Sequence, residues 1–141
     1  MKLPFKLQPE NPAHEDISSY AVDRVFISPE GLGPGELRSL ARDAVRTVAA
    51  GCEAAGAKDV SHVKLYLEHE SGFIHANAVS GNPEITVAGR DGVTAKQFRL
   101  VMNAVIYGLS EYSIRTSVEQ GIEAVQIQYG LTLVTAQGKN H

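Results

Sequence analysis

The chain has 141 residues, a length that suits one domain with a substantial hydrophobic core. Apolar residues make up 43% and charged residues 21%, values typical of globular proteins, which exclude disorder for most of the length. The net charge of −3, the aromatic content of 6% and the lack of tryptophan argue against a nucleic-acid-binding protein. A single cysteine, Cys52, excludes an intramolecular disulfide and a multi-cysteine metal site.

No apolar run approaches the roughly 20 residues that a membrane helix requires, and the first residues lack the apolar core of a signal peptide. We therefore expect a soluble, cytoplasmic protein without membrane or nucleic-acid partners. Residues 1–17 are polar and contain three prolines, which predicts an extended arm. Residues 18–136 then form one α+β domain, and residues 137–141 a flexible tail.

The first half of the domain is predicted as a strand, a helix and a hairpin. Val25 and Ile27 alternate with Arg24 and Phe26 in a strand over residues 20–28. A glycine- and proline-rich break follows, and apolar residues at three- and four-residue steps then predict a helix over residues 34–55. Residues 62–79 alternate between apolar and polar side chains on both sides of a turn, as in a β-hairpin.

The second half is predicted as a short strand, a helix and a final strand. Residues 84–88 form the short strand. Thr94 and Gln97 have the spacing of a capping box, so a second helix should begin there and end between residues 113 and 120. Alternation over residues 123–134 predicts the last strand.

The resulting order is β-α-β-β-β-α-β. Two amphipathic helices need a sheet face to cover, so we expect a two-layer sandwich with both helices on one face of a mainly antiparallel sheet of four to five strands. Without the strand at 84–88 the order would be ferredoxin-like. With it, both helix N-termini should lie at the same end of the sheet.

The outward-facing residues of the predicted strands should gather on the sheet face that the helices leave open. These residues are Arg24, Phe26, His62, Lys64, Tyr66, Glu68, His75, Asn77, Gln126, Gln128 and Thr132. Such a face is either solvated, packed against a second copy of the chain, or the location of a catalytic or metal site. Its long aromatic and amide side chains, with few charges, favour an interface over a free surface.

The hairpin supplies the candidate catalytic residues, His75, Glu68 and Tyr66. With a two-residue turn at Ser71-Gly72, Glu68 lies opposite His75 and could orient the imidazole as a general base. A four-residue turn instead places Tyr66 opposite His75 and Glu68 opposite Phe73, and the apolar pattern permits both registers. His62 or His69 could complete a zinc ligand set, but the spacing matches no known metal motif, so we expect no metal.

Lys64, Asn77, Arg90 and Gln128 are the candidate ligand-binding residues. Arg90 lies in a glycine-flanked loop just before the predicted second helix, where it could bind a carboxylate or phosphate. No catalytic motif is complete in the sequence and no cofactor is indicated. We therefore expect a homo-oligomeric binding or accessory protein that recognises a small ligand or a partner protein. The alternative is an enzyme with an inter-subunit site built on a Glu–His pair.

Overall fold

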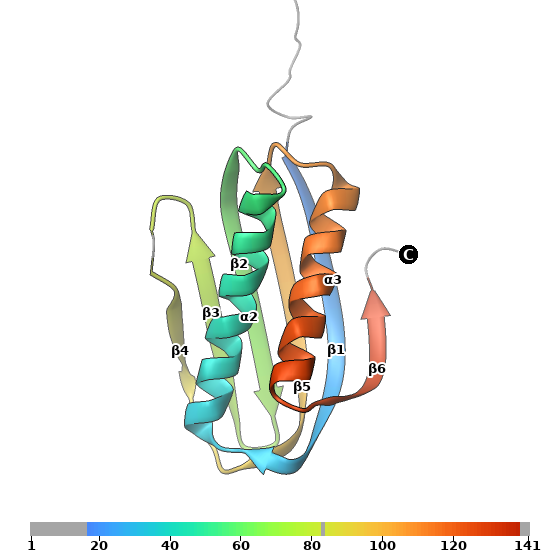
Figure 1. Ribbon diagram of the computed structural model, residues 1–141. Coiled ribbons are helices and arrows are strands. Elements are labelled where there is room, and N and C mark those ends of the chain that lie inside the picture. The colour runs from blue at the N-terminus through green and yellow to red at the C-terminus, as the bar shows by residue number, and fades with distance from the viewer. Residues whose placement is uncertain (1–16, 83, 139–141) are drawn as a thin grey trace, which may run out of the picture.

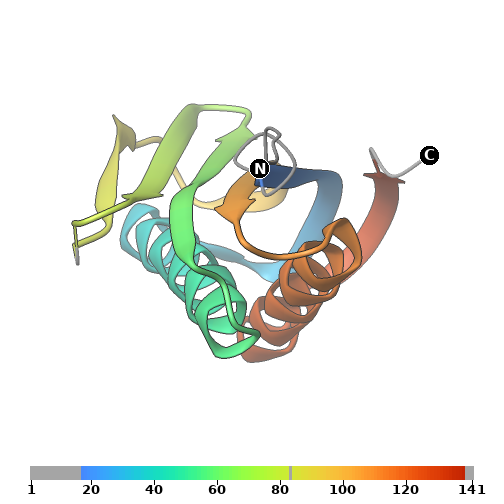
Figure 2. The ribbon, with the colours of Figure 1, turned by 90° about the horizontal axis from the view of Figure 1, so that it is seen from above.

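The computed structural model describes residues 17–82 and 84–138, so the predicted arm lies almost wholly outside the described residues. Six antiparallel strands form one sheet, and two helices cover one of its faces (Figures 1 and 2). The predicted α+β two-layer sandwich is therefore confirmed, with six strands instead of four to five.

The elements follow the order β-α-β-β-β-β-α-β. They are β1 (Ile17–Leu32), α2 (Pro34–Ala54), β2 (Asp59–His69), β3 (Gly72–Val79), β4 (Thr86–Arg90), β5 (Ala95–Tyr107), α3 (Glu111–Gln128) and β6 (Thr132–Gly138). In space the strands lie in the order β4-β3-β2-β5-β1-β6. The last strand takes in the first two residues of the predicted flexible tail.

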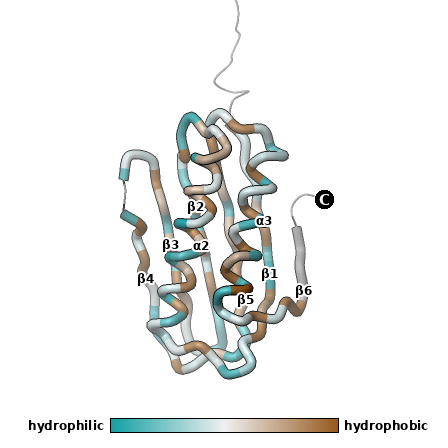
Figure 3. Tube along the Cα trace, viewed as in Figure 1, coloured by the Kyte–Doolittle hydropathy of each residue, from teal (hydrophilic) through white to brown (hydrophobic). Residues whose placement is uncertain are grey.

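The core lies between the helices and the sheet. Helix α2 packs over β2 and β3, while α3 packs over β1 and against α2. Alternate residues of the central strands point into this layer, and buried positions such as Leu65 and Met102 are register partners across β2 and β5. Figure 3 shows apolar residues distributed along both helices and the sheet.

The predicted first helix is correct. Its apolar stripe is fully buried, and Pro34 stands at its first turn, where a proline disturbs no helical hydrogen bond. Glu36 accepts a hydrogen bond at 3.0 Å from the backbone N–H of Gly33, the residue that precedes the helix. The predicted hairpin and the short strand near residues 84–88 are also present, as β2, β3 and β4.

The predicted second helix is wrong. The segment from Ala95 to Tyr107 is β5, which pairs with both β1 and β2, and α3 begins only at Glu111. Ser110 caps α3 by accepting a hydrogen bond from the backbone N–H of Ser113, so the Thr94/Gln97 spacing is not a helix cap. The last predicted strand is mostly wrong as well, because residues 123–128 belong to α3.

The direction of α3 differs from the predicted direction of the second helix, because the chain contains the additional strand β5. Because β5 precedes α3, the two helices run antiparallel and begin at opposite ends of the sheet (Figure 1). The prediction that both helix N-termini share one end is therefore wrong. The glycine-rich loops after β1 and β4 nevertheless lie near each other, since Arg38 in the first turns of α2 bonds Asp91 Oδ1 at 2.8 Å.

Candidate functional site

The face of the sheet that carries no helix is the candidate site, and we call it the open face (Figure 2). Strand register places its side chains in rows that cross the sheet. One row runs from Asp23 through Val101 and Tyr66 to His75, and the next from Val25 through Arg99 and Glu68 to Phe73. Residues distant in the sequence therefore lie side by side on this face.

Much of the open face is apolar. The apolar and aromatic members at its described positions are Ile17, Ala21, Val25, Ile27, Tyr66, Phe73, Val79, Ala88, Val101, Val105 and Tyr107. Most are half-buried, because neighbouring side chains shield them only partly. Antiparallel sheets with a solvated face normally alternate apolar and polar residues, so this composition is unusual for a face in water.

An aromatic cluster lies on the β2–β3 side of the open face. The ring centroids of Tyr66 and His75 are 4.8 Å apart, and those of Phe73 and His75 are 5.4 Å apart. The Arg90 guanidinium lies 5.4 Å from the centroid of the Phe73 ring. Such a cluster offers flat apolar surface with a cation at its edge, which suits a planar or anionic group of a partner.

A bidentate ion pair joins β1 and β5 on the same face. Arg99 donates from Nε to Asp23 Oδ1 at 2.9 Å and from Nη2 to Asp23 Oδ2 at 2.6 Å. The Asp23 carboxylate thereby raises the pKa of Arg99. This geometry holds the guanidinium in one orientation.

Two further groups of the open face have shifted pKa values. Burial raises the pKa of Tyr66, and hydrogen bonding to Glu68 raises it further. Burial lowers the pKa of His62, and the nearby charge of Lys64 lowers it further. Neutral Tyr66 and neutral His62 are thus the favoured forms, which lowers the cost of covering this face.

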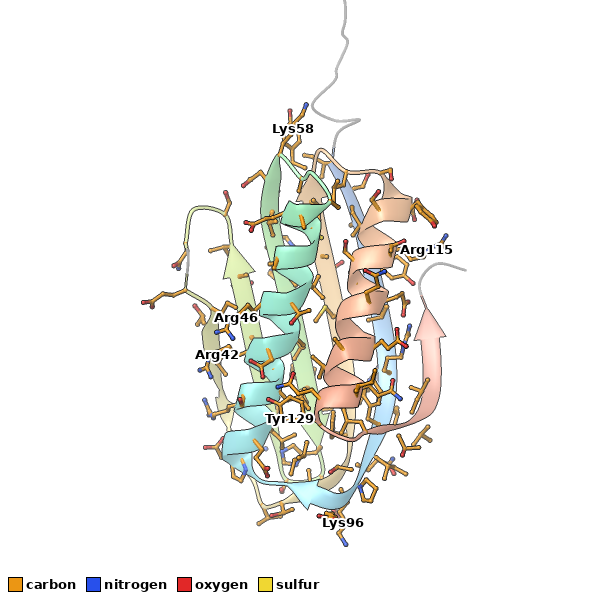
Figure 4. All side chains as sticks on the ribbon, viewed as in Figure 1. Arg42, Arg46, Lys58, Lys96, Arg115 and Tyr129 are labelled. Atoms are coloured by element: carbon orange, nitrogen blue, oxygen red, sulfur yellow. The ribbon has the colours of Figure 1, made fainter. Side chains whose placement is uncertain are left out.

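A cavity of about 500 Å³ opens where the β2–β3 turn meets the start of β5. Its lining includes Val25, Glu68, His69, Glu70 and Arg99. Figure 4 shows Lys96, another lining residue, at the same end of the sheet.

The structure shows which of the two predicted hairpin registers is present. Tyr66 pairs with His75 and Glu68 with Phe73, so Glu68 does not lie directly across from His75. Lys64 pairs with Asn77 on the same face, and the predicted residues of β2 and β3 are therefore brought together as expected. Within the described residues, no group of three or more histidine, cysteine, aspartate or glutamate side chains could hold a metal ion.

Other predicted positions on the open face are wrong. Arg24 and Phe26 point to the helix side, where Phe26 joins the core and Arg24 bonds Glu119 of α3. Gln128 ends α3 and donates a hydrogen bond to Asp43 Oδ2 of α2 at 3.4 Å, so it belongs to the helix layer and not to the open face. Gln126 is also helical, because the segment that carries both glutamines is not a strand.

Arg90 lies on β4 and not before a helix, so the predicted anion site at a helix N-terminus does not form. Sequence reasoning also missed Asp23 and Arg99. In the sequence, the only indication of either residue is that it stands next to an apolar residue of a strand. The pattern around Arg99 predicts a helix, so it gives no indication that Arg99 lies beside Asp23. In the part of the chain that the structure describes, no helix is long and apolar enough to span a membrane.

Comparison with known proteins supports the fold alone. No protein-family model matches the chain, and no curated protein matches its sequence. The crystal structure of AtUAH in complex with glyoxylate superposes on 88% of this chain with a TM-score of 0.53 and 9% identity. The crystal structure of Zn(II)-bound YjiA GTPase from E. coli covers 74% of this chain with a TM-score of 0.41 and 14% identity. The matched region is 29% of each of those chains, so this chain spans less than a third of their length.

Proposed function

We propose that the protein is a homodimeric binding module whose open face packs against the open face of a second copy. The observation that carries the proposal is the half-buried apolar composition of that face, centred on Val101 and Val105 of β5. Apolar side chains on a sheet surface gain stability when a partner removes them from water.

The size of the face fits such a dimer. Six strands about 4.8 Å apart give the sheet a width of about 24 Å. The central strands are roughly 38 Å long at about 3.3 Å per residue, so the area of the open face is on the order of 900 Å². A stable protein interface buries about 800 Å² on each partner. One open face therefore offers enough area for a symmetric dimer.

The charges of the open face are also compatible with self-association. Arg99 is paired with Asp23 within the chain, and the remaining described charges on the two central rows include both signs, on Glu68 and Arg90. In a two-fold symmetric contact a residue away from the axis meets a different residue of the other copy, so opposite charges can pair across the interface.

The test is the mass of the full chain in solution, measured by native mass spectrometry and by light scattering. The expected mass is twice 15.1 kDa. The variant Val101→Lys, which places a charge in the middle of the open face, should give a protein of monomer mass with an unchanged circular dichroism spectrum.

Thr47→Lys is the matched control, because Thr47 is exposed on α2 and the same substitution there leaves the open face unchanged. It should keep the dimer mass. A monomeric unmodified protein, or a Val101→Lys variant that stays dimeric, would contradict the proposal.

The enzyme alternative depends on a Glu68–His75 pair. Since the register places Phe73 opposite Glu68, the direct cross-strand pair does not form. The binding role therefore takes precedence over catalysis.

A further inference from the structure

The 500 Å³ cavity at the end of the open face carries fixed and opposite charges. Arg99 lies on its β5 side, and Glu68, the register partner of Arg99 across β2 and β5, lies on its β2 side. Glu70 and Lys96 add one further charge of each sign to the lining. The volume falls within the range of about 300–1,000 Å³ that small-molecule sites occupy.

The guanidinium of Arg99 is held in one orientation by Asp23. Its bonds to Asp23 use Nε and Nη2, so the guanidinium is drawn toward β1 and away from Glu68. Among the described residues, Nη1 of Arg99 has no hydrogen-bond acceptor, and Glu68 forms no ion pair. Arg99 and Glu68 thus interact through their charges across neighbouring strands without a direct ion pair, and Glu68 also accepts a hydrogen bond from Tyr66.

The wall of the cavity is closed by the β2–β3 turn. The backbone N–H of Val93 donates to Ser71 Oγ at 3.0 Å, which ties the turn to the segment that leads into β5. Gly72 permits this close approach, since a Cβ there would lie 2.3 Å from the backbone oxygen of Arg90. These contacts hold the turn against the segment that leads into β5.

We infer that this cavity binds a small zwitterion of the α-amino-acid type, with its carboxylate at Arg99 and its ammonium group at Glu68. A simple anion would meet the carboxylates of Glu68 and Glu70, and a simple cation would meet Arg99 and Lys96. A molecule that carries both charges satisfies both sides. Neighbouring cross-strand positions are about 5 Å apart, a separation that suits the two charged groups of one amino acid with a hydrogen bond at each end.

The apolar lining selects among such ligands. Of its two valines, Val25 is half-buried and Val93 is 70% exposed. These side chains favour an aliphatic amino acid over a strongly polar one.

The inference deepens the proposed binding role but does not need the dimer, because Glu68 and Arg99 line the same cavity of one chain. The dimer and the ligand site can therefore be contradicted independently of each other. Loss of the dimer appears in the mass measurement, whereas loss of the ligand site appears only in the binding measurement.

The test is a titration of the full ¹⁵N-labelled chain, followed by amide chemical shifts, with L-valine, N-acetyl-L-valine and L-valinamide. We expect L-valine to shift the amides of residues 68–71 and 93–99. Each derivative lacks one of the two charges, and its dissociation constant should be at least about tenfold higher than that of L-valine.

Variants of the charged residues provide a second readout. Glu68→Gln and Arg99→Gln should each weaken L-valine binding by about tenfold or more. Glu123→Gln removes a charge from an exposed position of α3, outside the cavity, and should bind L-valine as the unmodified chain does. The inference is overturned if L-valine shifts no cavity amide at high millimolar concentration. It is equally overturned if a derivative binds as tightly as L-valine, or if Glu123→Gln lowers affinity as much as Glu68→Gln.

Discussion

At the scale of single residues, the best-defined polar contact lies on the helix side of the sheet. Arg24 is 9% exposed and donates through Nη2 to both carboxylate oxygens of Glu119 at 2.7 Å. The Tyr20 hydroxyl donates to the same carboxylate at 2.7 Å. Burial and this acceptor raise the pKa of Tyr20 to about 12. The cluster joins α3 to β1, near the edge of the sheet.

Glu119→Gln should destabilise the protein by about 2 kcal/mol, because it leaves the buried Arg24 charge without its anionic partner. Urea unfolding followed by circular dichroism measures the change. Glu53→Gln, at an exposed position of α2, is the control and should change the free energy of unfolding by less than about 0.5 kcal/mol. Equal effects of both substitutions would show that the Arg24 contact adds no stability.

His62 should make stability depend on pH. Its pKa in the folded chain is lowered from 6.5, so the unfolded chain binds the proton more readily. The stabilisation is therefore fully present above pH 6.5 and is lost as the pH falls through the lower folded pKa. We expect His62→Gln to lose less stability on acidification than the unmodified chain, as measured by urea midpoints across this range. Parallel pH profiles for the two proteins would exclude this contribution.

At the scale of elements, α2 and α3 approach closely through small residues. A Cβ at Gly121 of α3 would lie 2.6 Å from Val48 Cγ2, a fully buried atom of α2. A Cβ at Gly51 of α2 would lie 3.6 Å from Ser117 Cβ, an ordinary contact. Tyr129, just after α3, adds a hydrogen bond from its hydroxyl to Asp43 Oδ2 at 2.7 Å, at the end of the helix pair labelled in Figure 4.

The two glycines allow a matched test of helix packing. Gly51→Ala should raise the free energy of unfolding by up to about 1 kcal/mol, because alanine favours helix and fits the space. Gly121→Ala should lower it by about 1–2 kcal/mol, since overpacking outweighs the same gain in helix propensity. Thermal unfolding of both variants measures the two changes in stability. A stabilised Gly121→Ala protein would mean that the helices can move apart at little cost.

At the scale of the whole molecule, the sheet is covered on one face only. The open face has a mostly half-buried apolar centre, aromatic rings beside it and a charged cavity at one end. A dimer through this face would enclose all three features, and its stability would then depend on protein concentration.

The melting temperature of the unmodified chain should rise with protein concentration, because mass action favours the folded dimer. Val101→Lys should remove this dependence, whereas Thr47→Lys should retain it. Differential scanning calorimetry over a hundredfold concentration range provides the measurement. A melting temperature independent of concentration in the unmodified chain would speak against a folded dimer.

Sequence patterns alone determined the first half of the fold. The buried stripe of α2 and the alternation in β2 and β3 each have one period, because each element has one clearly apolar side. Those patterns also placed Tyr66, Glu68, His75 and Asn77 together on the open face, since a hairpin register permits only a few pairings.

The secondary structure of residues 94–134 was decided only by the tertiary structure. In β5 the buried Met102 is flanked by the open-face residues Val101 and Asn103, and Val105 adds a second apolar residue on that face. Apolar residues on both faces of a strand hide its period of two and resemble a helical stripe. The same ambiguity concealed the Asp23–Arg99 pair and the cavity, because both require β5 to lie between β1 and β2. Strand neighbours are set by the packing of the whole sheet, which no local pattern contains.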